Sequence, residues 1–213
     1  MLHAARRLAA SGVVDRLVVT APAGLAEAIA DIVGRDPHVT VPVRVVDGGP
    51  TRQASVAAGL AAADGDDDVV LVHDAARPLA SPGLVRRVTA AVRSGWPAVV
   101  PGVAVTDTIK RVSAAVSTTA PGGIVVERVT GTPDRSELRA IQTPQGFERA
   151  LLQRAHSEGA ARAGADHLAA TDDAGLVEAL GEPVHVVAGE QAALKITTEH
   201  DLVVAGLLLQ DDA

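Results

Sequence analysis

The sequence predicts an α/β fold in which an open, mostly parallel sheet carries helices on both faces. Strand and helix patterns alternate along most of the 213 residues, and such alternation is typical of parallel sheets built from strand–helix–strand units. One strand pattern, Val69–Val72, is short and wholly apolar, as in strands covered on both faces. These observations predict a buried sheet whose strand ends are the place for ligands.

The first half of the chain follows this alternation. Leu2–Ala10 has apolar residues at helical spacing, and Gly12 follows where a helix would end. After an acidic turn at 64–68, the strand Val69–Val72 resumes the pattern. The remaining predicted elements are strands at 16–20, 41–46 and 98–103 and helices at 24–33, 53–63 and 82–94.

The alternation breaks between Val105 and Leu138. Two strand-like segments, Thr106–Val112 and Ile124–Val129, flank a weak Ser/Thr/Ala-rich stretch, which predicts a β-arm over residues 106–137. The strand character of both flanks argues against the alternative, a disordered insertion. Because the arm has little apolar bulk of its own, we expect it to pack on a second copy of the chain.

The last third returns to the α/β body, so residues 1–213 form a single domain in which the arm is an excursion. Residues 139–147 lead back from the arm, and Thr171 and Asp172 suit the N-cap of a following helix. The predicted elements are helices at 148–157 and 174–180, a strand at 184–187 and a helix that begins near 199.

Composition excludes several classes of function. The net charge of -7 and the pI of about 5.4 argue against a nucleic-acid partner. The chain has no cysteine, which excludes disulfides, thiolate nucleophiles and Cys-ligated metals. The apolar stretch Leu202–Leu209 is too short to cross a bilayer, and Met1–Ala10 lacks the apolar core of a signal peptide. We therefore expect a soluble cytoplasmic protein with no membrane partner.

Charged residues gather at one predicted strand end. Val69–Val72 leads directly into His73 and Asp74, and Arg77 follows. A ligand site and a plain salt-bridged loop are both compatible with this segment alone. The chain uses seventeen arginines but only two lysines, and lysine, a compact point charge, suits contact with a phosphate oxygen. Both lysines fall in segments with other site-like residues: Lys110 and Lys195.

The motifs together resemble one family. They are Gly48-Gly49-Pro50-Thr51-Arg52-Gln53-Ala54-Ser55, His73-Asp74-Ala75-Ala76-Arg77-Pro78, Asp107-Thr108-Ile109-Lys110, Thr143-Pro144-Gln145, Thr171-Asp172-Asp173 and Lys195-Ile196-Thr197. In this order and spacing they resemble the 2-C-methyl-D-erythritol 4-phosphate cytidylyltransferases of non-mevalonate isoprenoid biosynthesis. The resemblance covers essentially the whole chain. It implies a Rossmann-like fold of the nucleotide-diphospho-sugar transferase type.

The resemblance also implies the reaction and the role of each site residue. CMP would pass from CTP to 2-C-methyl-D-erythritol 4-phosphate with release of pyrophosphate. A Mg²⁺ ion would be held mainly by the CTP phosphates, with no metal ligand from the protein. The implied residues are Gly49, Ser55 and Ala75 for CTP, Asp74, Arg77, Thr108 and Thr143 for the second substrate, and Lys195 and Arg135 for catalysis. Thr108 and Arg135 would serve the neighbouring subunit of a homodimer.

One part of the family pattern has no counterpart here. The family begins with a strand and a glycine-rich loop that wraps the triphosphate, a lead-in of roughly 30 residues. Met1–Ala5 instead resembles the helix that follows that lead-in. We expect the absent strand to belong in the middle of the sheet, so that residues 1–213 alone would be inactive or nearly so. The alternatives are a ribitol-5-phosphate cytidylyltransferase and a non-catalytic, truncated dimeric paralogue.

Overall fold

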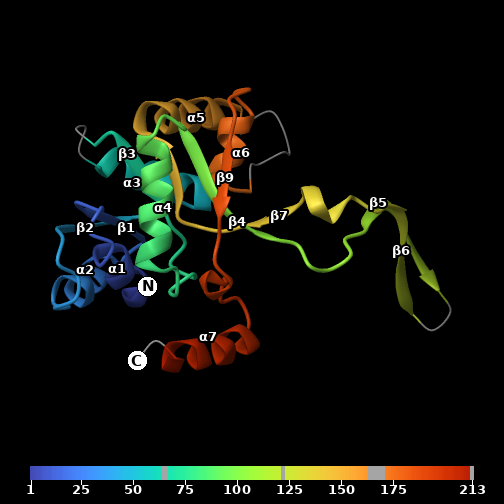
Figure 1. The fold of residues 1–213 in the computed structure, drawn as a ribbon, viewed down its shortest axis with the longest axis horizontal. Helices are drawn as coiled ribbons and strands as arrows, with labels where there is room; N and C mark the ends of the chain where they lie inside the picture. Colours follow the sequence, from blue (N-terminus) through green and yellow to red (C-terminus); the bar gives the residue numbers. More distant parts are fainter. Residues whose placement is uncertain (64–66, 121–122, 163–170, 212–213) are drawn as a thin grey trace.

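The computed structural model describes residues 1–63, 67–120, 123–162 and 171–211, which form a body with a projecting arm (Figure 1). Part of the predicted acidic turn, 64–66, and residues 121–122 of the arm lie outside the described residues. The helices are α1 Leu2–Ala9, α2 Ala26–Gly34, α3 Arg52–Ala62, α4 Pro82–Arg93, η1 Arg135–Glu137, α5 Arg149–Arg162, α6 Asp173–Glu178, η2 Gln191–Ala193 and α7 Glu199–Asp211. The strands are β1 Leu17–Ala21, β2 Val43–Asp47, β3 Val69–Val72, β4 Ala98–Ala104, β5 Arg111–Ala120, β6 Ile124–Gly131, β7 Arg139–Ile141, β8 Gln145–Glu148 and β9 His185–Ala188.

The α/β class is confirmed, but the strand directions are more mixed than the alternation predicts. In the body, β1 pairs with β2 and β4 pairs with β9 in parallel. The other pairs are antiparallel: β8 lies between β3 and β4, and β7 continues along β4 beyond β8. After the arm, the chain forms β7 and β8, which therefore run antiparallel to the strands with which they pair.

Strand β8 was not predicted, and its packing explains why it forms. It contains Phe147, the only phenylalanine of the chain, which is fully buried against Leu152 of α5 and Val72 of β3. A Cβ atom on Gly146 would lie 2.6 Å from Cγ1 of Val88, so the glycine lets α4 approach the strand closely. The Pro-Gln-Gly sequence indicates a turn, yet burial of the aromatic ring makes the segment a strand.

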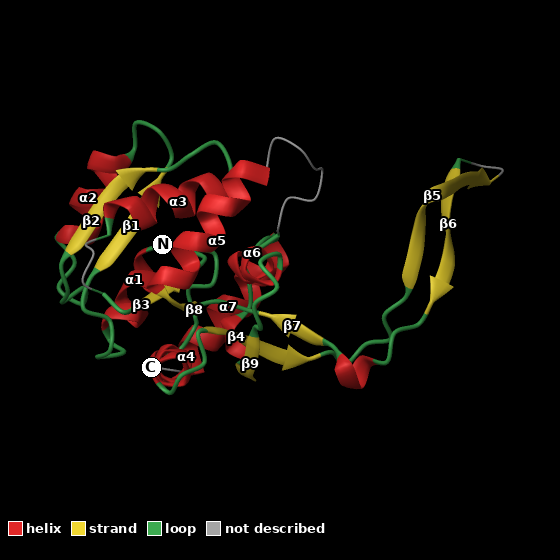
Figure 2. Ribbon diagram, turned by 90° about the horizontal axis from the view of Figure 1, so that it is seen from above, coloured by secondary structure: helices red, strands yellow, loops and turns green. Residues whose placement is uncertain are grey.

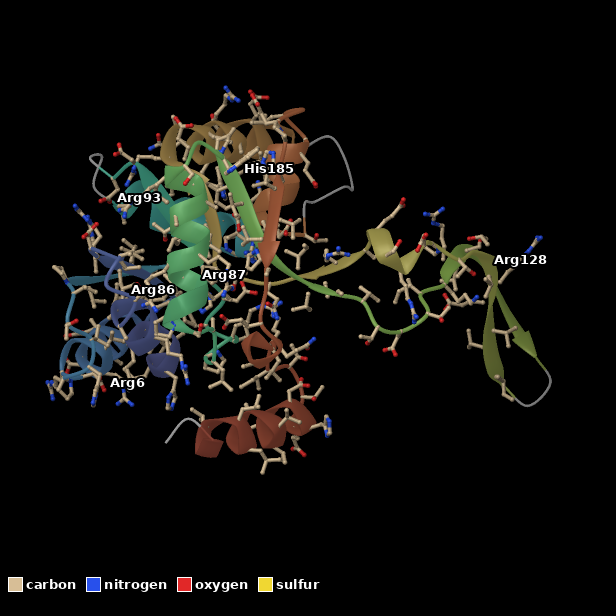
Figure 3. The ribbon with its side chains drawn as sticks, viewed as in Figure 1. Arg6, Arg86, Arg87, Arg93, Arg128 and His185 are labelled. Carbon is tan, nitrogen blue, oxygen red and sulfur yellow. The ribbon has the colours of Figure 1, made fainter. Side chains whose placement is uncertain are left out.

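Two of the apolar clusters in the body lie on opposite sides of it. One lies between α1, α2 and the β1–β2 pair and is centred on Ala5, Leu17 and Val33. The other, around Phe147, packs α5 and α6 against the five-stranded sheet. Helix α4 joins the two sides, because Arg86 donates to the carbonyl of Ser11 at 3.2 Å and Arg87 to that of Ala188 at 2.8 Å (Figure 3).

The arm extends away from the body as an antiparallel β5–β6 ribbon (Figures 1 and 2). The first predicted arm strand begins too early: residues 105–110 are loop, and β5 starts at Arg111. Along β6, Ile124, Val125, Val126 and Val129 are each 46–64% exposed. Arg128, on the same strand, points into solvent (Figure 3). The arm therefore presents apolar side chains that no part of the described body covers.

Candidate active site

The site is organised around Asp74, just beyond the carboxyl end of β3. One carboxylate oxygen, Oδ2, lies 3.0 Å from Nζ of Lys195, and the other, Oδ1, lies 3.4 Å from Nε of Arg52. The backbone N–H of Asp74 donates to Oγ1 of Thr143 at 3.0 Å. Folding thus brings together three predicted site residues that are far apart in the sequence.

The two cations keep Asp74 ionised. Burial alone would raise the pKa of its carboxyl group, but the ammonium of Lys195 and the guanidinium of Arg52 outweigh burial and lower that pKa. The sequence alone does not indicate a role for Arg52. Its position at the start of α3, directly after the glycine loop, is the signal that could have identified it.

The glycine loop and the start of α3 form a second wall. Thr51 caps α3 by accepting the N–H of Ala54 at 3.1 Å, and the hydroxyl of Ser55 accepts the N–H of Gly49 at 3.1 Å. A Cβ atom on Gly49 would lie 2.4 Å from Cβ of Ala54, so only glycine allows this approach. Gly49 and Ser55, both predicted to read the cytosine, are therefore adjacent and mutually fixed.

Thr143 and His73 fix the loop that follows β3 through hydrogen bonds. The buried hydroxyl of Thr143 lies 3.0 Å from Nδ1 of His73, whose Nε2 lies 3.2 Å from the carbonyl of Arg77. Burial lowers the pKa of His73 to about 4, so the ring is neutral at pH 7. His73 therefore acts as a neutral hydrogen-bonding group that fixes the loop.

Arg77 is held by the protein backbone. Its guanidinium donates to the carbonyls of Ala193 at 2.8 Å and Ile141 at 3.2 Å. The N–H of Ile196 also donates to the carbonyl of Ala76 at 2.8 Å. These bonds tie the Lys195 loop to the loop after β3, and they place Lys195, whose side chain is 45% exposed, at the mouth of the site.

A cavity of about 580 Å³ opens beside these residues. At one end it is lined by Arg52, Ser55, Asp74 and Ala75. It continues between β1 and β3, which do not pair with each other: within the described residues, β1 pairs with β2 and β3 with β8. We call this space between the two strands the central groove.

The two arm residues of the predicted site are not at Asp74. Thr108 lies in the loop before β5, and Arg135 begins the short helix η1 at the base of the arm, well away from the body (Figure 1). Both are exposed, and Arg135 donates to the carbonyl of Thr106 at 2.5 Å. Within one chain they therefore do not join Lys195.

In the part of the chain that the structure describes, no three His, Cys, Asp or Glu side chains are grouped so that they could hold a metal ion. Across residues 1–63, 67–120, 123–162 and 171–211, no helix combines the length and apolarity needed to cross a bilayer.

An α/β body with cations around a strand-end carboxylate, beside a glycine loop and a cavity, is suited to anionic ligands, and the family match identifies the chain as a nucleotidyltransferase. The family described as "IspD: 2-C-methyl-D-erythritol 4-phosphate cytidylyltransferase" matches residues 1–211. The chain therefore belongs to the 2-C-methyl-D-erythritol 4-phosphate cytidylyltransferase family.

Individual relatives agree with this assignment. The chain is 51% identical to a 2-C-methyl-D-erythritol 4-phosphate cytidylyltransferase of Rhodococcus opacus (strain B4), over 95% of this chain and 79% of that protein. The 4-diphosphocytidyl-2C-methyl-D-erythritol synthase of Anaerococcus prevotii DSM 20548 superimposes with a TM-score of 0.83 at 29% identity, covering 98% of this chain and 88% of the other. The 2-C-methyl-D-erythritol 4-phosphate cytidylyltransferase of Thermus thermophilus gives a TM-score of 0.65 at 39% identity, covering 92% of this chain and 98% of the other.

Proposed function

We propose that this protein transfers CMP from CTP to 2-C-methyl-D-erythritol 4-phosphate in non-mevalonate isoprenoid biosynthesis. The single observation that carries the assignment to these residues is the placement of Lys195 and Arg52 at the two carboxylate oxygens of Asp74, a residue that lines the cavity. Two polyanions must meet in the reaction, and fixed cations at the meeting point lower their repulsion.

The chemistry needs alignment rather than a general base. An oxygen of the methylerythritol phosphate attacks the α-phosphorus of CTP, a new P–O bond forms, and pyrophosphate leaves with the electrons of the bond that breaks. The attacking phosphate is already anionic, so no side chain has to remove a proton. Lys195, half-exposed and in contact with Asp74, would lie between the two phosphates and stabilise the charge that develops.

The CTP end of the site follows from the glycine loop. The backbone of Gly49 and the hydroxyl of Ser55 would read the edge of the cytosine, and exposed Ala75 would contact the ribose. Asp74 would hold hydroxyl groups of the second substrate. For Thr143 and Arg77, whose polar groups already bind protein atoms, the geometry favours orientation of the loops over direct contact with the substrate phosphate.

We propose a homodimer formed through the arm. Support comes from the exposed Ile124, Val125 and Val129 on β6, since apolar side chains arranged along an exposed strand are typical of an interface. Thr108 and Arg135, remote from Asp74 in their own chain, would then reach the partner's site and bind the substrate phosphate.

The metal proposal concerns Mg²⁺. The described residues do not form a cage of acidic ligands, and both oxygens of Asp74 face cations. We propose that one Mg²⁺ enters with CTP and is held mainly by its phosphates. The predicted cytoplasmic location likewise remains a proposal, which fractionation of the cells would test.

We also propose that an extended strand, with a phosphate-binding loop after it, fills the central groove in the active enzyme. Among the described residues, no strand pairs with the facing edges of β1 and β3, and Val18 and Val70 are among the apolar residues that line the groove. The test fuses an extended strand and a glycine-rich loop ahead of residue 1 to give an extended chain. A higher melting temperature and restored turnover are expected, whereas an unchanged protein would overturn the proposal.

The function is tested by pyrophosphate release from CTP with Mg²⁺ and either methylerythritol phosphate or ribitol 5-phosphate. Turnover with methylerythritol phosphate alone supports the proposal, and preference for ribitol phosphate would identify the second cytidylyltransferase. If the extended chain binds neither substrate and releases no pyrophosphate, it is a non-catalytic paralogue.

A further inference from the structure

A chain of ionisable side chains connects the interior of the body to the candidate active site. From the inside outward it consists of His156 on α5, Asp173 on α6, Arg52 on α3, Asp74 after β3, and Lys195 before α7. The successive closest contacts measure 2.9, 2.8, 3.4 and 3.0 Å. Five separate segments contribute, so the arrangement exists only in the folded protein.

Asp173 anchors Arg52 from the interior of the body. Its side chain is 1% exposed, and a buried carboxylate requires a compensating partner because its removal from water is costly. Oδ1 meets Nε2 of His156, whereas Oδ2 lacks a directed hydrogen bond among the described residues, although Nη1 of Arg52 is 2.8 Å away. We take this approach as a charge contact, and the always-charged guanidinium of Arg52 compensates Asp173.

Arg52 therefore makes two unequal contacts. Its Nη1 approaches Asp173 at 2.8 Å, while its Nε lies 3.4 Å from Asp74. On the other side of Asp74, Lys195 is 45% exposed. An arriving phosphate competes with Asp74 for the flexible ammonium group, whereas the guanidinium stays beside a carboxylate that is closed to solvent.

We propose that Arg52 is a positioning residue: anchored by Asp173, it holds Asp74 in place when Lys195 turns from Asp74 to the substrate phosphates. The inference rests on the proposed function and adds to it an exchange of ion pairs on substrate binding. Without Arg52, Asp74 would have neither of its two ion-pair partners at the moment when Lys195 leaves, and it would be free to move or to accept a proton.

The kinetic test compares Arg52→Met, Arg52→Lys and Asp173→Asn in the active enzyme, with Arg44→Met as the control. Arg44, on neighbouring β2, is exposed and donates to the carbonyl of Ala62. We expect kcat of Arg52→Met to fall about tenfold or more, with little change in the KM for CTP. Arg52→Lys should recover part of the loss, and Asp173→Asn should reproduce part of it, because the anchor is gone. A rise in the KM for CTP with kcat unchanged would instead show direct phosphate contact and overturn the proposal.

A second readout does not depend on turnover. The groups that face Asp74 are Arg52, Lys195, His73 and Arg77. Titration of the Asp74 carboxyl by carbon NMR in the 213-residue chain should give a higher pKa in Arg52→Met than in the parent, and no change in Arg44→Met.

Circular dichroism identifies any variant that fails to fold, and the neutral variant Arg52→Gln then replaces Arg52→Met in the titration. If the pKa of Asp74 is the same with and without Arg52, the positioning role is wrong. If the pKa moves but the parent enzyme does not transfer CMP, the proposed function fails instead, so the two failures are distinguishable.

Discussion

Lys195 provides the sharpest test of the mechanism, because the chain offers a matched control. The protein has only two lysines. Nζ of Lys195 lies 3.0 Å from Asp74 at the mouth of the site, whereas Nζ of exposed Lys110 lies 2.7 Å from Oγ1 of Thr132 on the arm. Replacing each by alanine removes the same charge and the same number of atoms at a site position and at an arm position.

The expected effects on stability and on activity differ in size. The side chain of Lys195 is 45% exposed, and a partly exposed ion pair contributes at most about 1 kcal/mol to stability. Arg52 remains beside Asp74 in the variant, which reduces the loss further. A preorganised charge contact to the transition state is worth roughly a hundredfold in rate, or about 2.7 kcal/mol.

The measurement is pyrophosphate release by the active enzyme, with thermal unfolding recorded for each variant. Lys195→Ala should lose at least about a hundredfold in turnover and melt close to the parent, while Lys110→Ala should keep both properties. Lys195→Arg should recover little, because the planar fork is bulkier and directs its N–H groups differently. Turnover of Lys195→Ala near that of the parent would remove this lysine from the mechanism.

Three further predictions concern the glycine loop, the arm and pH. Gly49→Ala should weaken CTP binding measured by calorimetry, because its new Cβ would lie 2.4 Å from Ala54; unchanged affinity would contradict the close approach. Deletion of residues 108–134 should give a monomer by light scattering, and a dimer would show that the arm is not the interface. Burial lowers the pKa of His73 from 6.5 to about 4, so the unfolded chain binds a proton more strongly and stability should fall as pH drops from 6.5 to 4, by on the order of 3 kcal/mol. In denaturant unfolding, the free energy of unfolding of His73→Gln should not show this loss between pH 6.5 and 4. An equal dependence of that free energy on pH in both proteins would refute the prediction.

Local sequence patterns were sufficient to predict the class of fold and most of its elements. The helices at 2–9 and 82–93 and the strands at 69–72 and 98–104 lie within a residue or two of their predicted bounds, because local apolar spacing and caps fix them. Asp172 caps α6 as predicted, accepting the N–H of Gly175 at 2.9 Å. The family motifs likewise indicated Asp74, Ser55 and Lys195 as candidate site residues.

How these pieces combine depends on contacts between distant segments. The strand β8 forms because Phe147 is buried between helices and strands that are remote in the sequence, and no local pattern contains that information. Folding also turns Arg77 toward the carbonyls of Ala193 and Ile141. It places Arg52 between Asp74 and Asp173, residues that are 22 and 121 positions further along the chain. Contacts between charged groups depend on where separate segments meet, and the meeting of segments is set by packing of the whole body.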